Sequence, residues 1–481
     1  MSSIKTNYIL NLINTVSGIM FPLITFPYIS RILFAEGIGL IQFYESIINY
    51  IVLFTSLGIP LYAIREISRC KHDPLLMART TLEILTLHCF LTTIGYAIVF
   101  LLIYFNCIED IGLFLVLSAT IVLTVIGVNW FYQGIEDFKY ITFRALAVRI
   151  LSIIALFVFV HTKDDLFNYA LIHVFSAAGN YIFNFIRLKK FIPKSVIPFS
   201  QLQIKRHISP TLRIFVLNLV TSIYANLDPV MLGYLSNTTA VGFYSGALKL
   251  TKVAMGIVAS MNTVIFPRFS FLFSQGELTK FFALGNKALK FIYAFAFPIT
   301  IGLIVLAKPL ILLFCGATFA PSILTLQILA PTIIIINISV LLGLELLYPQ
   351  NKENIVIVCT IIGAALNITL NILLIPKYAQ VGAAIASVIA ETGVVISLII
   401  LGKHHLQITY LKGNIKYFIA AIILLLSLLA IAQIGCNHIT TIFLSCSIGV
   451  IIYTSVLYYL KDKLFLELRD LILTQIKIFR K

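Results

Sequence analysis

Residues 38–60 read IGLIQFYESIINYIVLFTSLGIP, a continuously apolar stretch with one charged residue, Glu45. A helix needs about 20 such residues to cross the hydrocarbon core of a bilayer. Similar stretches recur along all 481 residues and leave no room for a separate soluble domain of ordinary size. They do not alternate in period two, which argues against a membrane β-barrel. The sequence therefore predicts an all-α integral membrane protein.

The composition supports this prediction and excludes other classes. Only 11% of the residues are charged, whereas a soluble domain has roughly a quarter. The net charge of +16 lies in short loops between the apolar runs, where it sets membrane orientation, so we expect no nucleic-acid partner. The seven cysteines have no metal-site or disulfide spacing. Because P-loop, GxSxG and HExxH motifs are also absent from the sequence, we expect no catalytic residue, metal or cofactor.

The apolar runs predict about fourteen transmembrane helices. They cover 8–33, 38–60, 77–105, 111–133, 142–160, 166–187, 210–235, 241–266, 284–307, 322–347, 354–375, 381–402, 416–435 and 441–460. With both termini cytoplasmic, most Lys and Arg residues fall on the cytoplasmic side. The other side then holds Arg31, Lys163, Lys308 and Lys377. This asymmetry is what the positive-inside rule requires.

The chain is predicted to contain two like-oriented six-helix lobes. FPYISRILFAEGIGLIQFY (26–44) and LDPVMLGYLSNTTAVGFYS (227–245) are loosely similar, and such repeats are typical of transporters with a cavity between their halves. The predicted parts are an N-lobe at 1–187, a basic cytoplasmic linker at 188–209, a C-lobe at 210–402, two further helices at 403–460 and a cytoplasmic amphipathic tail at 461–481. The basic loops are expected to contact anionic lipids.

Six motifs resemble the Wzx-type polysaccharide or O-antigen flippases of the multidrug/oligosaccharidyl-lipid/polysaccharide exporter (MOP) superfamily. They are FPYISRILFAEGIGL (26–40), LGIPLYAIREI (57–67), NWFYQGIEDFKYITFR (129–144), VGFYSGALKLTK (241–252), LAPTIIIINISVLLG (329–343) and ALNITLNILLIPKYAQVGAAIASVIAE (365–391). The resemblance implies a V-shaped bundle of two lobes plus two C-terminal helices. It also implies alternating access that moves undecaprenyl-diphosphate-linked oligosaccharide repeat units from the cytoplasmic to the outer leaflet of a bacterial inner membrane.

The resemblance leaves several points open. A proton or Na⁺ gradient is the expected driving force, and a polysaccharide polymerase is a candidate partner protein. A cation-coupled drug or metabolite exporter and a peptidoglycan-precursor flippase of the same superfamily are alternatives, because one fold hosts several substrates. A glycan polymerase or ligase would need a large outer loop, and the outer loops here are short.

Polar stripes within the apolar spans mark candidate substrate contacts. Gln42, Glu45 and Asn49 lie at i, i+3 and i+7 and share one helical face. Similar stripes are Asn7, Asn11, Asn14 and Gly18 in the first span and Thr360, Gly363, Asn367 and Asn371 in the eleventh. Such stripes face either an aqueous lumen or a neighbouring helix through hydrogen bonds.

Charged residues in the spans complete the candidate set. Lys249 and Lys252 suit a diphosphate as point charges, and Arg31 suits it through its planar guanidinium group. Asn226 and Asp228 are further lumen candidates, and an Asp228–Lys pair that neutralises itself is the alternative. The predicted substrate-binding set is Arg31, Gln42, Glu45, Asn49, Asn226, Asp228, Lys249 and Lys252.

Other ionisable residues in the spans have separate interpretations. Glu45 and Glu391 are the ion-coupling candidates, because an intramembrane carboxyl group can take up and release a proton. Glu83 and Glu345 lie near cytoplasmic span ends, where a satisfied pair or a side chain reaching the headgroups is expected. His88 and His173 are each alone on their helical face, which favours a structural role over metal binding.

Overall fold

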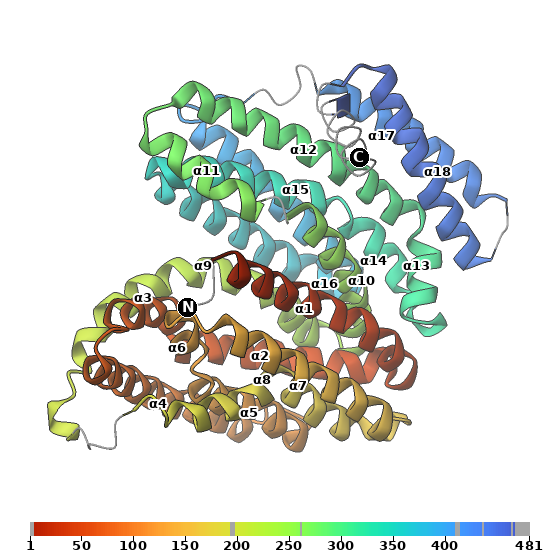
Figure 1. The fold of residues 1–481 in the computed structure, drawn as a ribbon. Coiled ribbons are helices and arrows are strands. Elements are labelled where there is room, and N and C mark those ends of the chain that lie inside the picture. Colours follow the sequence, from red (N-terminus) through yellow and green to blue (C-terminus); the bar gives the residue numbers. More distant parts are fainter. Residues whose placement is uncertain are drawn as a thin grey trace, which may run out of the picture. The chain divides into compact units, whose positions relative to one another are not determined.

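The structure is a computed structural model that describes residues 4–192, 198–259, 262–408, 414–434, 437–462 and 465–466. Within those ranges the chain forms helices and no strands, so the predicted all-α class is confirmed (Figure 1). Two compact units divide the chain, Met1–Tyr234 and Leu235–Lys481. The sequence assigned 210–235 to the second lobe, whereas nearly all of this helix belongs to the first unit. The predicted domain boundaries remain predictions.

The first unit contains nine α-helices within the described ranges. They are α1 (Ile4–Ile32), α2 (Phe34–Ser56), α3 (Ile59–Cys70), α4 (Pro74–Tyr104), α5 (Ile111–Gly127), α6 (Asn129–Gly134), α7 (Phe138–Phe159), α8 (Leu166–Leu188) and α9 (Lys205–Leu235), with 3₁₀ turns η1 (Lys163–Asp165) and η2 (Phe199–Gln201).

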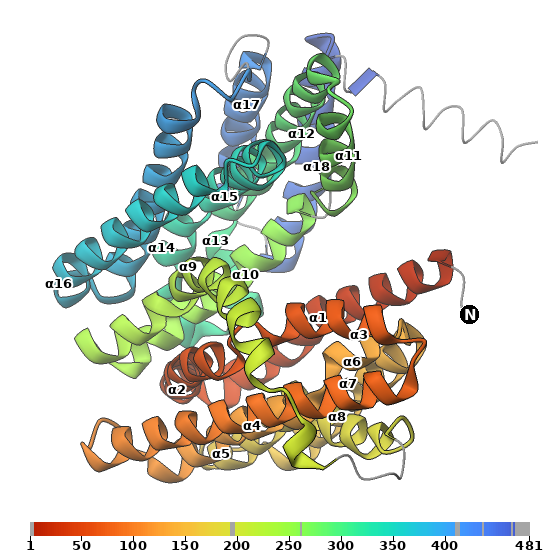
Figure 2. The same ribbon diagram turned by 90° about the vertical axis from the view of Figure 1, so that its left-hand side faces the viewer.

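The second unit continues from α9 through further helices, most of them long (Figure 2). They are α10 (Thr238–Ala259), α11 (Asn262–Ser274), α12 (Leu278–Val305), α13 (Ala307–Phe314), α14 (Ser322–Leu329), α15 (Thr332–Val340), α16 (Glu353–Gly402), α17 (Ile415–Ala432) and α18 (His438–Tyr459). The shorter elements are 3₁₀ turns η3 (Ala317–Phe319) and η5 (Tyr348–Gln350) and the π-helical segment η4 (Leu341–Leu347).

Ten helices in the described residues are long and apolar enough to cross a membrane. One of them, α16, contains two predicted spans, 354–375 and 381–402, which meet at Ala379 with φ 47° and ψ −126°. The predicted spans 166–187, 210–235 and 241–266 correspond to the helices α8, α9 and α10. The chain is therefore a multi-pass membrane protein, and the number fourteen remains a prediction. Of the predicted amphipathic tail, 463–464 and 467–481 lie outside the described residues, as do 193–197 of the basic linker.

The two halves of α16 form a helical hairpin. A Cβ atom on Gly382 would lie 2.5 Å from the carbonyl oxygen of Leu374, so the chain turns back with room only for hydrogen there. A Cβ on Gly363 would likewise lie 2.2 Å from Val394 of the returning half. Small residues at such positions let two membrane helices approach closely.

Aspartates begin several helices of the first unit. Asp73 accepts hydrogen bonds from the backbone N–H groups of Leu75 and Leu76, both at 3.0 Å, at the start of α4. Asp110 and Asp137 cap α5 and α7 in the same way. These side chains satisfy donors that a helix N-terminus would otherwise leave unpaired, which fixes where the helices start.

The turn before α8 is held by a capping box. Asp165 accepts hydrogen bonds from the backbone N–H groups of His161 and Thr162, at 3.0 and 2.9 Å. These bonds, with a third from the Thr162 hydroxyl, hold the pKa of the Asp165 carboxyl below its ordinary value because they stabilise its charged form.

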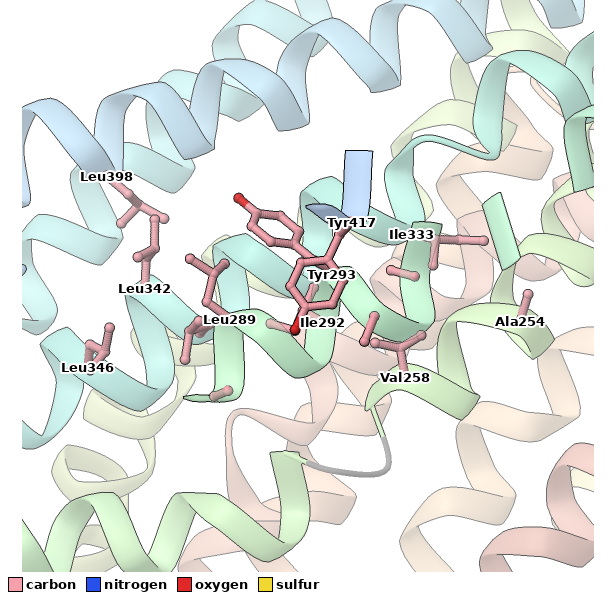
Figure 3. Packing of buried hydrophobic residues seen from close by; sticks show 14 of the residues in the cluster. Ala254, Val258, Leu289, Ile292, Tyr293, Ile333, Leu342, Leu346, Leu398 and Tyr417 are labelled. Carbon is pink, nitrogen blue, oxygen red and sulfur yellow. The ribbon is translucent and has the colours of Figure 1, made fainter. Parts of the chain in front are cut away.

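Each unit has its own apolar core. In the first unit, Trp130, Phe131 and Tyr132 of α6 pack with residues of α3 and α4. In the second unit, Leu289 and Tyr293 of α12 lie in a cluster with Leu342, Leu346 and Tyr417 (Figure 3). Close packing of this kind fixes the positions of the helices that surround the sites described below.

Candidate functional site

A polar cavity lies inside the first unit, among α2, α5 and α8. Its volume is about 170 Å³. The polar side chains that line it are Glu45 and Asn49 from α2, Thr120 and Thr124 from α5, and His173 and Tyr181 from α8. Pockets with a few hydrogen-bonding groups among apolar walls are the usual form of a small-molecule site. This cavity is therefore the candidate functional site.

Glu45 is the charged centre of this cavity. Its Oε1 lies 3.2 Å from Nε2 of His173, within ion-pair distance but without the alignment of a hydrogen bond. Gln42 donates a hydrogen bond of 3.4 Å to Oε2 of the same carboxylate. The side chains of Glu45 and His173 are 32% and 28% exposed, so both groups are reachable from the cavity. The contact becomes an ion pair only when the imidazole ring is protonated.

The sequence did not predict the contact between His173 and Glu45, because the two residues come from different helices. The structural role expected for His173 remains a prediction. The structure brings Gln42, Glu45 and Asn49 together at or beside one cavity. Their role in substrate binding remains a prediction.

An intramembrane cation, Arg149, contacts the polar stripe of α1. From the middle of α7 it donates hydrogen bonds to the backbone oxygen of Asn14 at 2.9 Å, to Oδ1 of Asn14 at 3.1 Å and to the hydroxyl of Ser17. A Cβ on Gly18 would lie 3.4 Å from Nη2 of Arg149. Sequence reasoning missed Arg149, although its position well inside the span 142–160 is a usable signal. The side chains of Asn7 and Asn11 lie outside the described part of the stripe.

The other predicted contacts are distributed over both units. Arg31 is exposed at the end of α1 and donates a hydrogen bond to the backbone oxygen of Pro27 in its own helix. Asn226 and Asp228 lie on α9 and are half-buried, and Asp228 acts electrostatically on Tyr50 of α2. In the second unit, Lys249 is half-buried and Lys252 is exposed, both on α10. The ion-coupling candidate Glu391 is half-buried on α16.

The stripe of the eleventh span is buried within the second unit. Asn367 and Asn371 are 1% and 0% exposed, and Nδ2 of Asn371 donates to Oδ1 of Asn367 at 3.0 Å. This bond lies within one helix, so it is not the hydrogen bond to a neighbouring helix that was the alternative interpretation, and the role of the stripe remains a prediction.

Glu83 is the centre of a buried network at the start of α9. Its carboxylate, 0% exposed, pairs with Arg79 and Arg206 and accepts from the backbone N–H of Gln203 at 2.7 Å. Nε2 of His207 lies 2.9 Å away, and Nδ1 of the same ring lies 2.7 Å from the Tyr62 hydroxyl. Glu83 is thus the satisfied pair that was expected.

Glu345 differs from the expectation for it. Its side chain neither reaches the headgroups nor forms a pair, because the residue is 2% exposed and makes no hydrogen bond or ion pair within the described ranges. Depth along a helix was visible in the sequence, but the rotation of that helix toward the protein interior was not.

An apolar cavity of about 390 Å³ lies in the second unit, among α12, α17 and α18. These three helices contact one another. Gly302, Leu424 and Gly449 are among its lining residues, and the polar groups there are few. A cavity of this kind suits an alkyl or prenyl chain.

No metal centre is visible in the described ranges, which contain no group of three or more His, Cys, Asp or Glu side chains placed to share an ion.

The model of the family described as "Polysaccharide biosynthesis protein" matches residues 4–273, more than half of the chain. A "Putative O-antigen transporter" of Escherichia coli (strain K12) is 22% identical over 396 residues, which are 81% of this chain and 94% of that protein.

Two solved structures share the fold. The lipid II flippase MurJ in an inward closed conformation has a TM-score of 0.73 at 16% identity, covering 95% of this chain and 99% of its own. An inward-facing multidrug resistance MATE family transporter of the MOP superfamily has a TM-score of 0.65 at 14% identity, covering 80% of this chain and 93% of its own. The resemblance inferred from the motifs is confirmed, and this chain belongs to the polysaccharide biosynthesis protein family.

Proposed function

We propose that this protein is a flippase that carries lipid-linked oligosaccharide repeat units across a bacterial cytoplasmic membrane for surface polysaccharide biosynthesis. The family, the O-antigen transporter relative and the flippase fold support this assignment. The observation that carries it is the polar cavity of the first unit. A pocket that holds Glu45, Asn49 and His173 inside an apolar helical unit offers sugar hydroxyls the partners that lipid cannot. The reaction is transport without covalent chemistry.

The substrate we propose is undecaprenyl diphosphate bearing one repeat unit. Glu45 and Asn49 would accept and donate hydrogen bonds to the sugar. Arg149 would hold a phosphate oxygen, because a guanidinium group binds phosphate bidentately. The apolar cavity among α12, α17 and α18 would take part of the prenyl chain, which would exchange contacts with lipid tails for close packing against apolar side chains. A proton or Na⁺ gradient would supply the energy.

The remaining features of the proposal concern the membrane. Both termini would be cytoplasmic, as the distribution of Lys and Arg predicts. The basic loops would contact anionic lipid headgroups. A polysaccharide polymerase on the outer side would consume the product.

The test uses the purified full chain in vesicles that contain a fluorescent undecaprenyl-diphosphate oligosaccharide in one leaflet. We expect the wild type to move the label to the other leaflet. Asn49→Leu removes a hydrogen-bonding group and Ala178→Phe fills the cavity that Ala178 lines, so each should slow transport at least tenfold. Thr93→Val is the matched control, because Thr93 is an exposed polar residue of α4 bonded to its own helix.

A second pair of variants tests the prenyl site. Gly302→Phe would fill the apolar cavity, where a Cβ at this position has nothing within 4 Å. Leu373→Phe adds the same ring at an exposed position of α16, 59% exposed. Export of a cationic dye by the wild type without movement of the lipid-linked oligosaccharide would contradict the proposal. Full transport activity of both Ala178→Phe and Gly302→Phe would also contradict it.

A further inference from the structure

Glu345 is a buried carboxyl group that the proposed binding sites do not use. It lies in the π-helical segment η4 (Leu341–Leu347) of the second unit and is 2% exposed. Its Oε1 atom is inaccessible and has no hydrogen-bond partner. Across the described residues the carboxyl makes no ion pair either. The two other membrane carboxylates with described contacts, Glu45 and Glu83, both have close partners.

The surroundings of Glu345 are apolar. Leu341, Leu342, Leu346 and Leu347 of the same segment are all 0% exposed. Figure 3 shows Leu342 and Leu346 among the buried side chains of the second unit. Glu345 therefore belongs to a segment that packs into the apolar core of the second unit, and only 2% of its surface is exposed.

No charged group compensates the carboxyl from the neighbouring elements. The segment packs against α11, α12, α15, α16 and η5, and α15 carries no titratable residue. The other four elements carry titratable side chains, none of which forms a hydrogen bond or ion pair with Glu345 within the described ranges. They are Arg268, Lys280, Lys287, Lys290, Tyr293, Tyr348, Glu353, Cys359, Lys377, Tyr378 and Glu391.

The backbone at this position is also unusual. A π-helix is rare, and it occurs mostly as a short insertion that is frequent at functional sites. Here it extends over Leu341–Leu347 and carries the orphaned carboxyl group in its middle. Two independent features, an uncommon backbone and an unpartnered buried acid, therefore coincide in one turn.

The chemistry of the site identifies its ligand. An ionised carboxylate without a partner is far more costly to bury than a neutral carboxyl group. A divalent metal cation would need several oxygen ligands, and within the described ranges no group of three or more acidic, His or Cys side chains is placed to share one. A proton needs only the carboxyl oxygen itself. The arrangement in this structure therefore fits the protonated acid.

We propose that Glu345 is a proton-binding site whose loading and release drive the transport cycle. This inference rests on the proposed flippase function and names the coupling ion and its carrier. In the packed arrangement the carboxyl group keeps its O–H bond. When η4 opens to water, that bond breaks, the proton passes to water and the carboxylate becomes hydrated.

The first test measures the proton directly on the full chain in lipid nanodiscs. Infrared absorption of a protonated carboxyl C=O group should be present at neutral pH and missing in Glu345→Gln. Glu277→Gln is the matched control, because Glu277 is exposed and paired with Lys280 at 2.9 Å; this variant should keep the band. Absence of a Glu345-dependent band at neutral pH would overturn the inference whether or not the protein transports.

The second test measures coupling in the vesicles described above. One proton exchanged per cycle should shift the substrate distribution between leaflets by about tenfold per unit of pH difference. Glu345→Gln, which resembles the neutral acid, should move substrate with a distribution ratio near one at any pH difference, whereas Glu345→Asp should keep part of the response. A pH-independent wild type, or one driven by a Na⁺ gradient instead, would overturn the inference while leaving the flippase function intact.

Discussion

Replacing Glu83 by alanine should destabilise the first unit by about 4 kcal/mol, as expected when one partner of a buried ionic network is removed. The change leaves the backbone N–H of Gln203 without a partner, and Nε2 of His207, a residue 1% exposed, keeps only the 3.3 Å contact with Nε of Arg206. An orphaned buried polar group costs about 1–3 kcal/mol, and the weakened contact of the imidazole ring adds to this cost. Arg79 and Arg206 are 33% and 41% exposed and can turn to water, so they add little.

The assay is thermal unfolding in detergent, followed by tryptophan fluorescence. Trp130 is the only tryptophan of the chain and lies buried in the first unit, so its emission reports on that unit. For a cooperative unit of 150–250 residues, 1 kcal/mol shifts the Tm by about 2–4 °C, which gives a fall of about 8–16 °C.

Glu66→Ala is the control for this measurement. Glu66 pairs with Arg65 at 3.2 Å and Arg69 at 3.0 Å, and these arginines are 52% and 66% exposed. Exposed pairs contribute about 0–1 kcal/mol, so the Tm should fall by only a few degrees. Equal Tm values for Glu83→Ala and Glu66→Ala would refute the stabilising role of the buried network.

Three further perturbations follow from the structure. Gly233→Ala would place a Cβ 2.1 Å from Cδ2 of Phe43, so overpacking should lower the free energy of unfolding by about 1–3 kcal/mol in a thermal unfolding experiment. Gly302→Ala, whose Cβ would have nothing within 4 Å, should leave the Tm unchanged. A lower Tm for Gly302→Ala than for Gly233→Ala would contradict the packing described here. Arg149→Lys keeps the charge but loses the planar fork, so vesicle transport should fall about tenfold; undiminished transport would exclude a phosphate contact there. Asp165→Asn should lower thermal stability at pH 7, because the lowered pKa of this carboxyl makes its contribution complete above the ordinary value of about 3.9. That contribution is lost as the pH falls through the lower folded-state pKa, so the difference from wild type should vanish in acid; a difference that grew on acidification would show the opposite linkage.

Sequence reasoning recovered the helical architecture because hydropathy and span length directly reflect the bilayer. It also separated 354–375 from 381–402, which the structure joins at the bend of Ala379. The count of fourteen spans remains a prediction, because hydropathy alone does not distinguish a weakly apolar span such as α9 from a buried helix. No apolar run in the sequence predicts the short helix α3. This helix follows Leu57 and Gly58, whose backbones have the left-handed conformation.

The candidate site was predictable only in part. Spacing placed Gln42, Glu45 and Asn49 on one face, because a single helix fixes that relation. The partners His173 and Arg149 come from other helices, and their approach depends on helix rotation and packing that periodicity does not encode. The same reason explains why Glu345 was misjudged.

The hairpin of α16 bears on how this protein is made. Two apolar helices joined by such a tight turn insert into a bilayer together, because the turn is too short for one helix to insert before the other. Extra residues between Lys377 and Gly382 would disturb the close packing of Gly363 against Val394. An epitope tag inserted into this turn should therefore impair folding, although ordinary exposed loops tolerate such tags. Two co-expressed fragments divided at this turn should likewise assemble poorly.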